Sequence, residues 1–97
     1  MRVLTKAVLR EYWKKFPEVE EQLKSWHMEA SRAKWRKPAD VIKNYPGTKV
    51  LSDNRIVFNI KGNKYRLIVK INYEYQITWV RFIGTHNEYD VIDATKI

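Results

Sequence analysis

Alternating apolar and polar positions mark the second half of the chain. Between residues 55 and 60, and again between 65 and 71, apolar side chains recur at every second position, as in a strand with one buried face. Residues Lys61–Lys64 lie between these runs and contain a Gly-Asn pair that tolerates positive φ. The pattern predicts two antiparallel strands joined by a four-residue loop, with Ile60 paired to Tyr65.

This pairing determines which residues share a face of the sheet. Asn59 stands opposite Arg66, and a second hairpin through residues 73–76 places Ile83 opposite Arg66 with Arg81 diagonal to it. One face is then apolar and the other is basic. Because the third strand ends beside the first hairpin loop, one end of the sheet gathers Lys61, Lys64, Arg66, Arg81 and His86.

The first half of the chain has helical periodicity. Apolar residues recur at three-to-four spacing from Val8 to Phe16, with Thr5 as the expected N-cap, and the stripe stops at Pro17. Pro17 suits the start of a second helix, whose apolar positions continue to Ala33. Two consecutive amphipathic helices predict an antiparallel helical hairpin.

Shorter elements complete the predicted order. They are an initial strand at Val3-Leu4, a helix from Pro38 to Tyr45, a strand from Val50 to Ser52 and a C-terminal helix from Asn87 to Ala94. The predicted class is α+β, with the helical hairpin packed on one face of a mainly antiparallel sheet of three to five strands. The other face is expected to be free, and residues 1–97 are expected to form a single domain.

The charge of the chain favours an anionic partner. It has 19 Lys and Arg against 11 Asp and Glu, a formal charge of +8, which suits RNA, DNA, the ribosome or an acidic protein segment. No cysteine is present, and His27 and His86 fall in different predicted elements, so we expect neither a metal site nor another cofactor. No apolar run approaches the roughly 18 residues of a membrane span, which favours a cytoplasmic protein without a membrane partner.

The chain resembles the HigB-type toxins of bacterial toxin–antitoxin systems, within the larger RelE/ParE-like group. The resemblance covers nearly the whole chain and rests on the helical pair, on Gly62–Leu67 and, most specifically, on Arg81–Asp90. It implies a RelE-like fold and a ribosome-dependent mRNA endoribonuclease, or mRNA interferase, that inhibits translation. It also implies a neutralising helix-turn-helix antitoxin of the HigA type, through which alone operator DNA is contacted.

RNA cleavage without a metal requires a deprotonated 2′-hydroxyl, positive charge at the phosphorane-like transition state and a proton for the departing 5′-oxygen. Arg66 is the candidate clamp, because its planar guanidinium can hold two phosphate oxygens. Arg81 either shares this clamp or forms an ion pair with Glu88 or Asp90.

Two residues are candidates for proton transfer. His86 suits a general acid or base because histidine titrates near neutrality, although a lone histidine after a strand also suits a structural role. Lys61 is either a base or an electrostatic stabiliser. The RelE branch tends to place a run of basic residues near the second strand of the site, whereas this chain has one lysine there. The division of roles between Lys61 and His86 therefore stays open.

Further residues are predicted to bind RNA. Beside the cluster these are Asn59, Lys64 and Tyr89, the last of which either stacks on a base or packs the C-terminal helix onto the sheet. The end of the second predicted helix adds Lys34, Arg36 and Lys37, a charge run that suits a helix C-terminus as well as a nucleic-acid patch.

Two other functions fit parts of the pattern. ParE-like proteins keep the fold but inhibit DNA gyrase without cutting RNA, and such an inhibitor would not need His86. A duplex-DNA-binding module is the weaker alternative, because no recognition helix with base-reading residues is evident.

Overall fold

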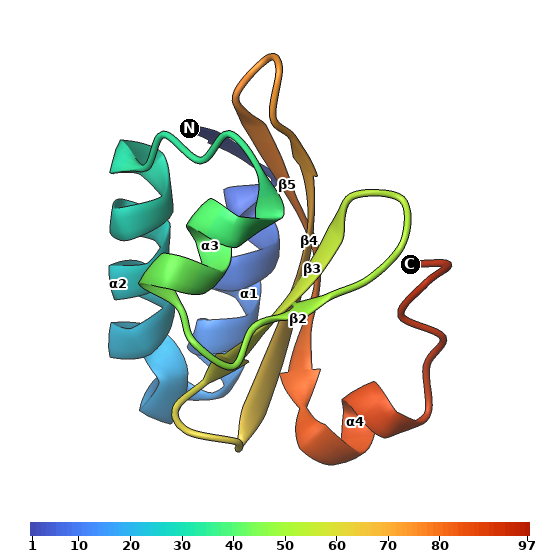
Figure 1. Cartoon of the computed structure of the whole chain (residues 1–97). Helices are drawn as coiled ribbons and strands as arrows, with labels where there is room; N and C mark the ends of the chain where they lie inside the picture. The colour runs from blue at the N-terminus through green and yellow to red at the C-terminus, as the bar shows by residue number, and fades with distance from the viewer.

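A five-stranded mixed sheet forms the middle of the computed structural model, which describes all 97 residues (Figure 1). The strand order is β1-β5-β4-β3-β2, with β1 parallel to β5 and the other pairs antiparallel. In chain order the elements are β1 (Arg2–Leu4), α1 (Lys6–Lys15), a 3-10 turn (Pro17–Val19), α2 (Glu20–Arg32), α3 (Pro38–Asn44), β2 (Lys49–Val50), β3 (Arg55–Ile60), β4 (Tyr65–Asn72), β5 (Ile77–Thr85) and α4 (His86–Asp90).

The helices α1, α2 and α3 lie together on one side of the sheet, whereas α4 and the C-terminal segment lie toward its other side (Figure 1). This arrangement confirms the predicted α+β class, the N-terminal helical hairpin and the short C-terminal helix. The initial strand, which the sequence predicted at Val3-Leu4, joins the edge of the sheet beside β5.

The register of both hairpins is as predicted at their turns. Ile60 pairs with Tyr65 and Asn59 with Arg66, and the second hairpin pairs Asn72 with Ile77. The first loop closes through a hydrogen bond from the Lys64 N–H to the Lys61 carbonyl, 3.3 Å between nitrogen and oxygen. Alternation and turn chemistry therefore determine the pairing near each loop.

A β-bulge in β5 contradicts the predicted position of Arg81. Ile68 pairs with Phe82 but Val69 pairs with Val80, so Arg81 is an extra residue without a partner on β4. The shift places Gly84, not Ile83, opposite Arg66. Phe82 thereby takes the diagonal position that the sequence assigned to Arg81.

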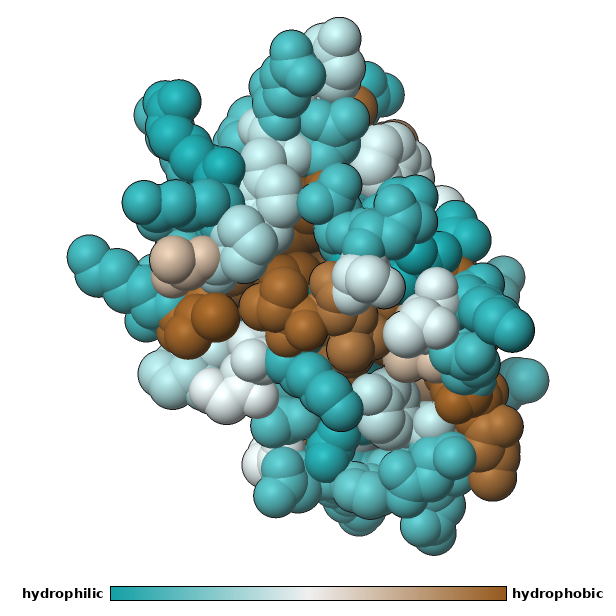
Figure 2. All heavy atoms as spheres, turned by 45° about the vertical axis from the view of Figure 1, so that its right-hand side comes forward, coloured by the Kyte–Doolittle hydropathy of each residue, from teal (hydrophilic) through white to brown (hydrophobic).

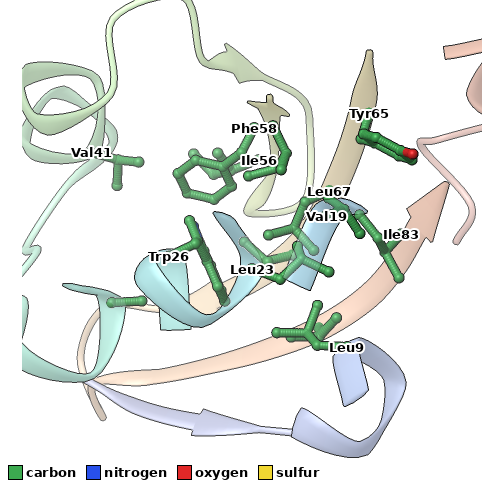
Figure 3. Close-up of a cluster of buried hydrophobic side chains, with 14 of the residues drawn as sticks. Leu9, Val19, Leu23, Trp26, Val41, Ile56, Phe58, Tyr65, Leu67 and Ile83 are labelled. Atoms are coloured by element: carbon green, nitrogen blue, oxygen red, sulfur yellow. The ribbon is translucent and has the colours of Figure 1, made fainter. Parts of the chain in front are cut away.

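The core lies between the three helices and the sheet, and Figure 3 shows helix side chains such as Leu23 and Trp26 meeting strand residues. Trp26 packs edge-on against Phe58, with 5.4 Å between the ring centroids. The predicted stripe of α1 is buried only in part, because Val8 is 36% and Phe16 is 41% exposed.

The second face of the sheet is not free, contrary to the prediction. Val57 and Ile68 lie outside the main core cluster, yet they are 2% and 0% exposed. The chain beyond α4 runs along this side (Figure 1), and the Arg55 Nε donates a hydrogen bond of 2.7 Å to the Ile97 carbonyl. The sequence-based pairing also places Val57 opposite Ile68 on this face, but the prediction treated the face as basic, whereas apolar side chains in its middle favour a cover.

The face turned forward in Figure 2 is largely hydrophilic, with hydrophobic residues gathered in a patch near its middle. In the whole chain, no helix combines the length and the apolar composition needed to cross a membrane.

Two helix starts differ from their predictions. Thr5 precedes α1, but its side chain does not cap that helix. Instead, its backbone is left-handed (φ 63°) and its hydroxyl bonds the backbone of Val80, 2.9 Å from both the nitrogen and the oxygen. The C-terminal helix begins at His86 and ends at Asp90 instead of spanning Asn87 to Ala94, and Thr85 and Glu88 form a capping box at its N-terminus.

We predict that Gly84→Ala lowers the free energy of unfolding by about 1–3 kcal/mol through overpacking. A Cβ at this position would lie 2.6 Å from the Phe82 Cζ and 3.2 Å from the Glu88 Cβ. Urea denaturation measures the cost in the wild-type and in a Phe82→Ala background. We expect the two substitutions to be coupled by about 1 kcal/mol or more. Additive costs would show that the Phe82 ring does not limit the space at Gly84.

Candidate functional site

The β3–β4 hairpin, the end of β5 and α4 meet at one end of the sheet (Figure 1). The backbone N–H of His86 donates to the Lys64 carbonyl, 3.0 Å away, which fixes the start of α4 to the hairpin. The sequence-predicted residues Lys61, Lys64, Arg66 and His86 therefore share this end. Their side chains, however, divide into separate groups.

Arg66 lies half-buried between the hairpin and α4. Its Nη1 donates to the Asn63 carbonyl at 2.9 Å and to the Tyr65 carbonyl at 3.4 Å, and its guanidinium carbon lies 6.0 Å from the centroid of the Tyr89 ring. The Nε and Nη2 atoms donate no hydrogen bond within the chain. The guanidinium is thus held on one side and open to an anion on the other.

His86 forms a pair with Asp90 one turn later in α4. The distance from His86 Nδ1 to Asp90 Oδ2 is 2.9 Å, and the side chains are 49% and 53% exposed. This contact orients the imidazole and leaves Nε2 without a partner in the chain. An acid or base at Nε2 is therefore accessible from solvent.

Both lysines of the hairpin loop point to Glu18, in the 3-10 turn. The Nζ of Lys64 lies 3.1 Å and that of Lys61 lies 3.7 Å from the Glu18 Oε2, and Lys61 also donates to the Glu18 carbonyl at 3.2 Å. The hydroxyl of Tyr65 donates to the other carboxylate oxygen. Glu18 thereby holds the two ammonium groups toward the helices, away from Arg66.

The hydrogen bond between Tyr65 and Glu18 shifts the pKa of both side chains. The Tyr65 hydrogen bond, followed by the Lys64 ammonium, lowers the pKa of Glu18 below its ordinary value, against a smaller effect of burial. Burial first, and then the Glu18 carboxylate, raises the pKa of Tyr65 to about 12. Glu18 is therefore ionised and Tyr65 is neutral at neutral pH.

A second tyrosine connects the helical layer to α4. Tyr12 of α1 packs edge-on against Tyr65, with 6.1 Å between the ring centroids, and its hydroxyl donates to the Glu88 Oε1 at 3.2 Å. Hydrogen bonds from Thr85 lower the pKa of Glu88, against the effect of burial. The same carboxylate therefore caps α4 and joins that helix to α1.

Two further predicted residues, Arg81 and Asn59, stand apart from these contacts, whereas Tyr89 takes part in the contact with Arg66. Arg81 is exposed and forms no ion pair, because Glu88 caps α4 and Asp90 contacts His86. Asn59 is exposed, and its amide lies 3.5 Å from the Gly47 carbonyl. Tyr89 is half-buried with Arg66 over its ring, and its predicted stacking on a base stays a prediction.

The basic run after α2 lies at the opposite end of the molecule. Lys34 and Arg36 line a hollow of about 440 Å³ together with residues of the β4–β5 turn, such as Tyr73 and Glu74. That turn is remote from the β3–β4 hairpin (Figure 1). Lys34, Arg36 and Lys37 therefore cannot contact the same phosphate as Arg66.

Sequence reasoning missed Glu18, Asp90 and the contact between Tyr12 and Glu88. The i,i+4 spacing of His86 and Asp90 and the Thr85-x-x-Glu88 pattern were visible signals. No local pattern indicated the partners of Glu18, because they lie more than 40 positions away. No group of three or more His, Asp or Glu side chains is placed to hold a metal ion.

Comparison with known proteins gives one consistent result. Residues 19–92 match a family model described as HigB_toxin, the RelE-like toxic component of a toxin–antitoxin system. The chain is 26% identical over 96 residues to the mRNA interferase toxin HigB of Escherichia coli K12, covering 97% of this chain and 92% of that protein. The mRNA interferases HigB of Escherichia coli O157:H7 and Shigella flexneri match with the same identity and coverage.

We predict that the stabilising effect of Glu18 depends on pH. The folded-state pKa of Glu18 is lowered, so its contribution is present above the unfolded value near 4.5 and is lost as the pH falls through the folded value. Urea denaturation at several pH values should therefore show Glu18→Gln less stable than wild type near neutrality, with the difference shrinking in acid. The control is Glu21→Gln, which removes an exposed carboxylate that forms no ion pair. A difference independent of pH would refute the ionic origin.

Proposed function

The chain belongs to the HigB family of RelE-like toxins, and we propose that it is a cytoplasmic, ribosome-dependent endoribonuclease that cleaves mRNA without a metal. The observation that carries the proposal is the pairing at one end of the sheet of an anchored arginine with an oriented histidine. Family membership implies a neutralising antitoxin, which we propose is of the helix-turn-helix HigA type. The names of the relatives support the activity on mRNA.

In this proposal the 2′-hydroxyl attacks the adjacent phosphate, and the 5′-oxygen departs. Such a reaction requires a base for the hydroxyl, cationic stabilisation of the pentacoordinate transition state and an acid for the leaving group. The end of the sheet offers a guanidinium, an imidazole and two ammonium groups within one surface region.

Arg66 acts as the transition-state clamp. Its Nη1 is engaged by backbone carbonyls of the hairpin and its flat face lies over Tyr89, so the guanidinium is oriented before substrate binds. The free Nε and Nη2 can donate to two phosphate oxygens in a forked arrangement. A preformed donor set stabilises developing charge without reorganisation during the reaction.

His86 transfers a proton through Nε2, and Asp90 is its positioning residue. A hydrogen bond at Nδ1 selects the tautomer in which Nε2 can accept a proton from the 2′-hydroxyl. In an in-line attack the 5′-oxygen departs on the opposite side of the phosphorus, so its proton comes from a second acid, such as water or a group of the ribosome.

The remaining cations support binding more than proton transfer. Glu18 pairs with Lys61 and Lys64 and holds them away from Arg66, so they add positive potential at this end of the sheet without contacting the scissile phosphate. Arg81 is exposed and unpaired, which suits a neighbouring phosphate of the message. Tyr89 and Asn59 extend the same surface, whereas Lys34, Arg36 and Lys37 bind a different part of the RNA or ribosome.

We predict that purified protein cleaves message on programmed ribosomes at least about 10³-fold faster than free RNA, because an external surface must align the 2′-hydroxyl for in-line attack. Single-turnover assays with mapping of 5′ ends measure both rates. Equal rates on unstructured free RNA would contradict ribosome dependence. Intact message together with relaxed or broken DNA in expressing cells would instead favour a gyrase inhibitor.

We predict that His86→Ala lowers the single-turnover rate by about 10² to 10⁴ while ribosome binding stays near wild type. Arg66→Ala should lose a comparable factor, and Arg66→Lys should recover it only in part, because one ammonium cannot reproduce the fork. Asp90→Asn should reduce the rate by about 10-fold to 100-fold through misorientation of the imidazole.

Matched controls separate chemistry from general effects of substitution. His27→Ala removes the other histidine, which lies half-buried in α2, and Lys70→Ala removes a cation of β4 that pairs with Asp53 at 3.3 Å. Both controls should cleave at the wild-type rate. Folded His86→Ala and Arg66→Ala proteins that bind and cut normally would show that this surface only makes contacts.

A further inference from the structure

A hollow in the surface of the molecule lies outside the proposed active site. It is a groove of about 560 Å³ between α1 and β5, lined by Val8, Glu11, Tyr12, Lys14, Lys15 and Ile83. Val8 is 36% exposed, so the groove offers apolar surface to a partner. The apolar stripe predicted for α1 is wider than the fold needs, and its uncovered part forms one wall of this groove.

The groove runs beside an unpaired part of a strand edge. On its outer side β5 pairs with β1 only from Ile77 to Trp79, and the Thr5 hydroxyl then satisfies the backbone of Val80. No strand covers β5 from Arg81 to Gly84 on that side. An extended peptide could therefore pair with this edge and place alternate side chains in the groove.

The charge of the groove selects the chemistry of its occupant. Lys14 and Lys15 line it against the single carboxylate of Glu11, on a chain of net charge +8. A segment that fits would carry apolar side chains toward Val8 and Ile83 and carboxylates toward the lysines. Such a segment belongs to a protein partner, because single-stranded RNA offers no strand edge and little apolar surface.

We infer that this groove is the docking site of an extended, acidic and apolar segment of the antitoxin, an inference that rests on the proposed toxin function. Tyr12 lines the groove while its hydroxyl donates to Glu88, the capping residue of α4. A bound segment would therefore contact the residue that joins α1 to the helix carrying His86. The antitoxin can in this way neutralise the toxin without covering Arg66.

Substitutions in the groove should separate neutralisation from toxicity. The probe is the full-length product of the adjacent gene whose co-expression restores growth of cells producing the wild-type toxin. Val8→Arg should weaken its binding about 100-fold, and the double variant Lys14→Glu with Lys15→Glu about 10-fold, as measured by calorimetry. Both variants should still arrest growth, also in the presence of the antitoxin.

Matched variants control for size and charge. Ile42→Arg introduces the same residue at a 41% exposed position of α3, and Lys6→Glu with Arg10→Glu makes the same charge change on α1 outside the groove. Both should bind the antitoxin within about twofold of wild type. Retained toxicity of each variant demonstrates that it folds. The double variant Lys14→Glu with Lys15→Glu changes only exposed positions, so it still tests the groove if Val8→Arg does not fold.

Four other outcomes would contradict the docking of the antitoxin in this groove. Wild-type affinity and neutralisation of both groove variants would place the antitoxin elsewhere, as would equal losses in the control variants. Self-association that is lost in Val8→Arg, with antitoxin binding unchanged, would assign the groove to a second copy of the chain. Weakened ribosome binding instead of weakened antitoxin binding would assign it to the ribosome. A wild-type toxin that no adjacent gene neutralises would contradict the antitoxin in the proposed function, and the groove inference with it.

Discussion

One extra residue in β5 determines which side chains of that strand reach the core and which reach the candidate site. Strand side chains alternate between faces, so inserting Arg81 reverses every position after it. Ile83 then enters the core beneath α1, and Gly84 comes to lie opposite Arg66. Without the bulge, the side chain of Ile83 would lie opposite Arg66 and take up the space that its guanidinium now has. Thr85 would also lose the position beside the β3–β4 hairpin from which α4 begins.

The second constraint is the satisfaction of two tyrosine hydroxyls at the boundary of the core. Tyr65 is 1% exposed, and a phenol in such a position needs a hydrogen-bond partner. Its partner, Glu18, also collects both lysines of the hairpin loop, and the neighbouring Tyr12 bonds the carboxylate that caps α4. The packing of the core and the position of the candidate site are therefore connected by the same pair of aromatic rings.

The parts of the fold that could be predicted from the sequence are those that depend on local spacing. The loop at Lys61–Lys64 and the pairing of Asn59 with Arg66 follow from alternation and turn chemistry. The bulge could not be predicted, because Val80-Arg81-Phe82-Ile83 fits the strand with or without an extra residue. Only the tertiary positions of Gly84 and α4 select the bulged register. The role of Glu18 required the tertiary fold, since its partners lie in the β3–β4 hairpin. The pairing of His86 with Asp90 was readable from its i,i+4 spacing, but the prediction treated Asp90 only as an ion-pair partner for Arg81.

The openness of the candidate site has a physical consequence for how it can act. His86 and Asp90 are each about half exposed, and a solvated pair of this kind contributes roughly 0–1 kcal/mol to stability, so its effect is on orientation. Water also competes with any phosphate for the free nitrogens of Arg66. A surface that closes over the end of the sheet would exclude this water and strengthen every electrostatic contact beneath it. In the proposed function, a site built from so few groups at one end of a small domain therefore gains most of its catalytic strength from the body against which it docks. In the same proposal, binding that body and cleaving RNA are coupled through one surface, while the groove between α1 and β5 stays accessible to the antitoxin.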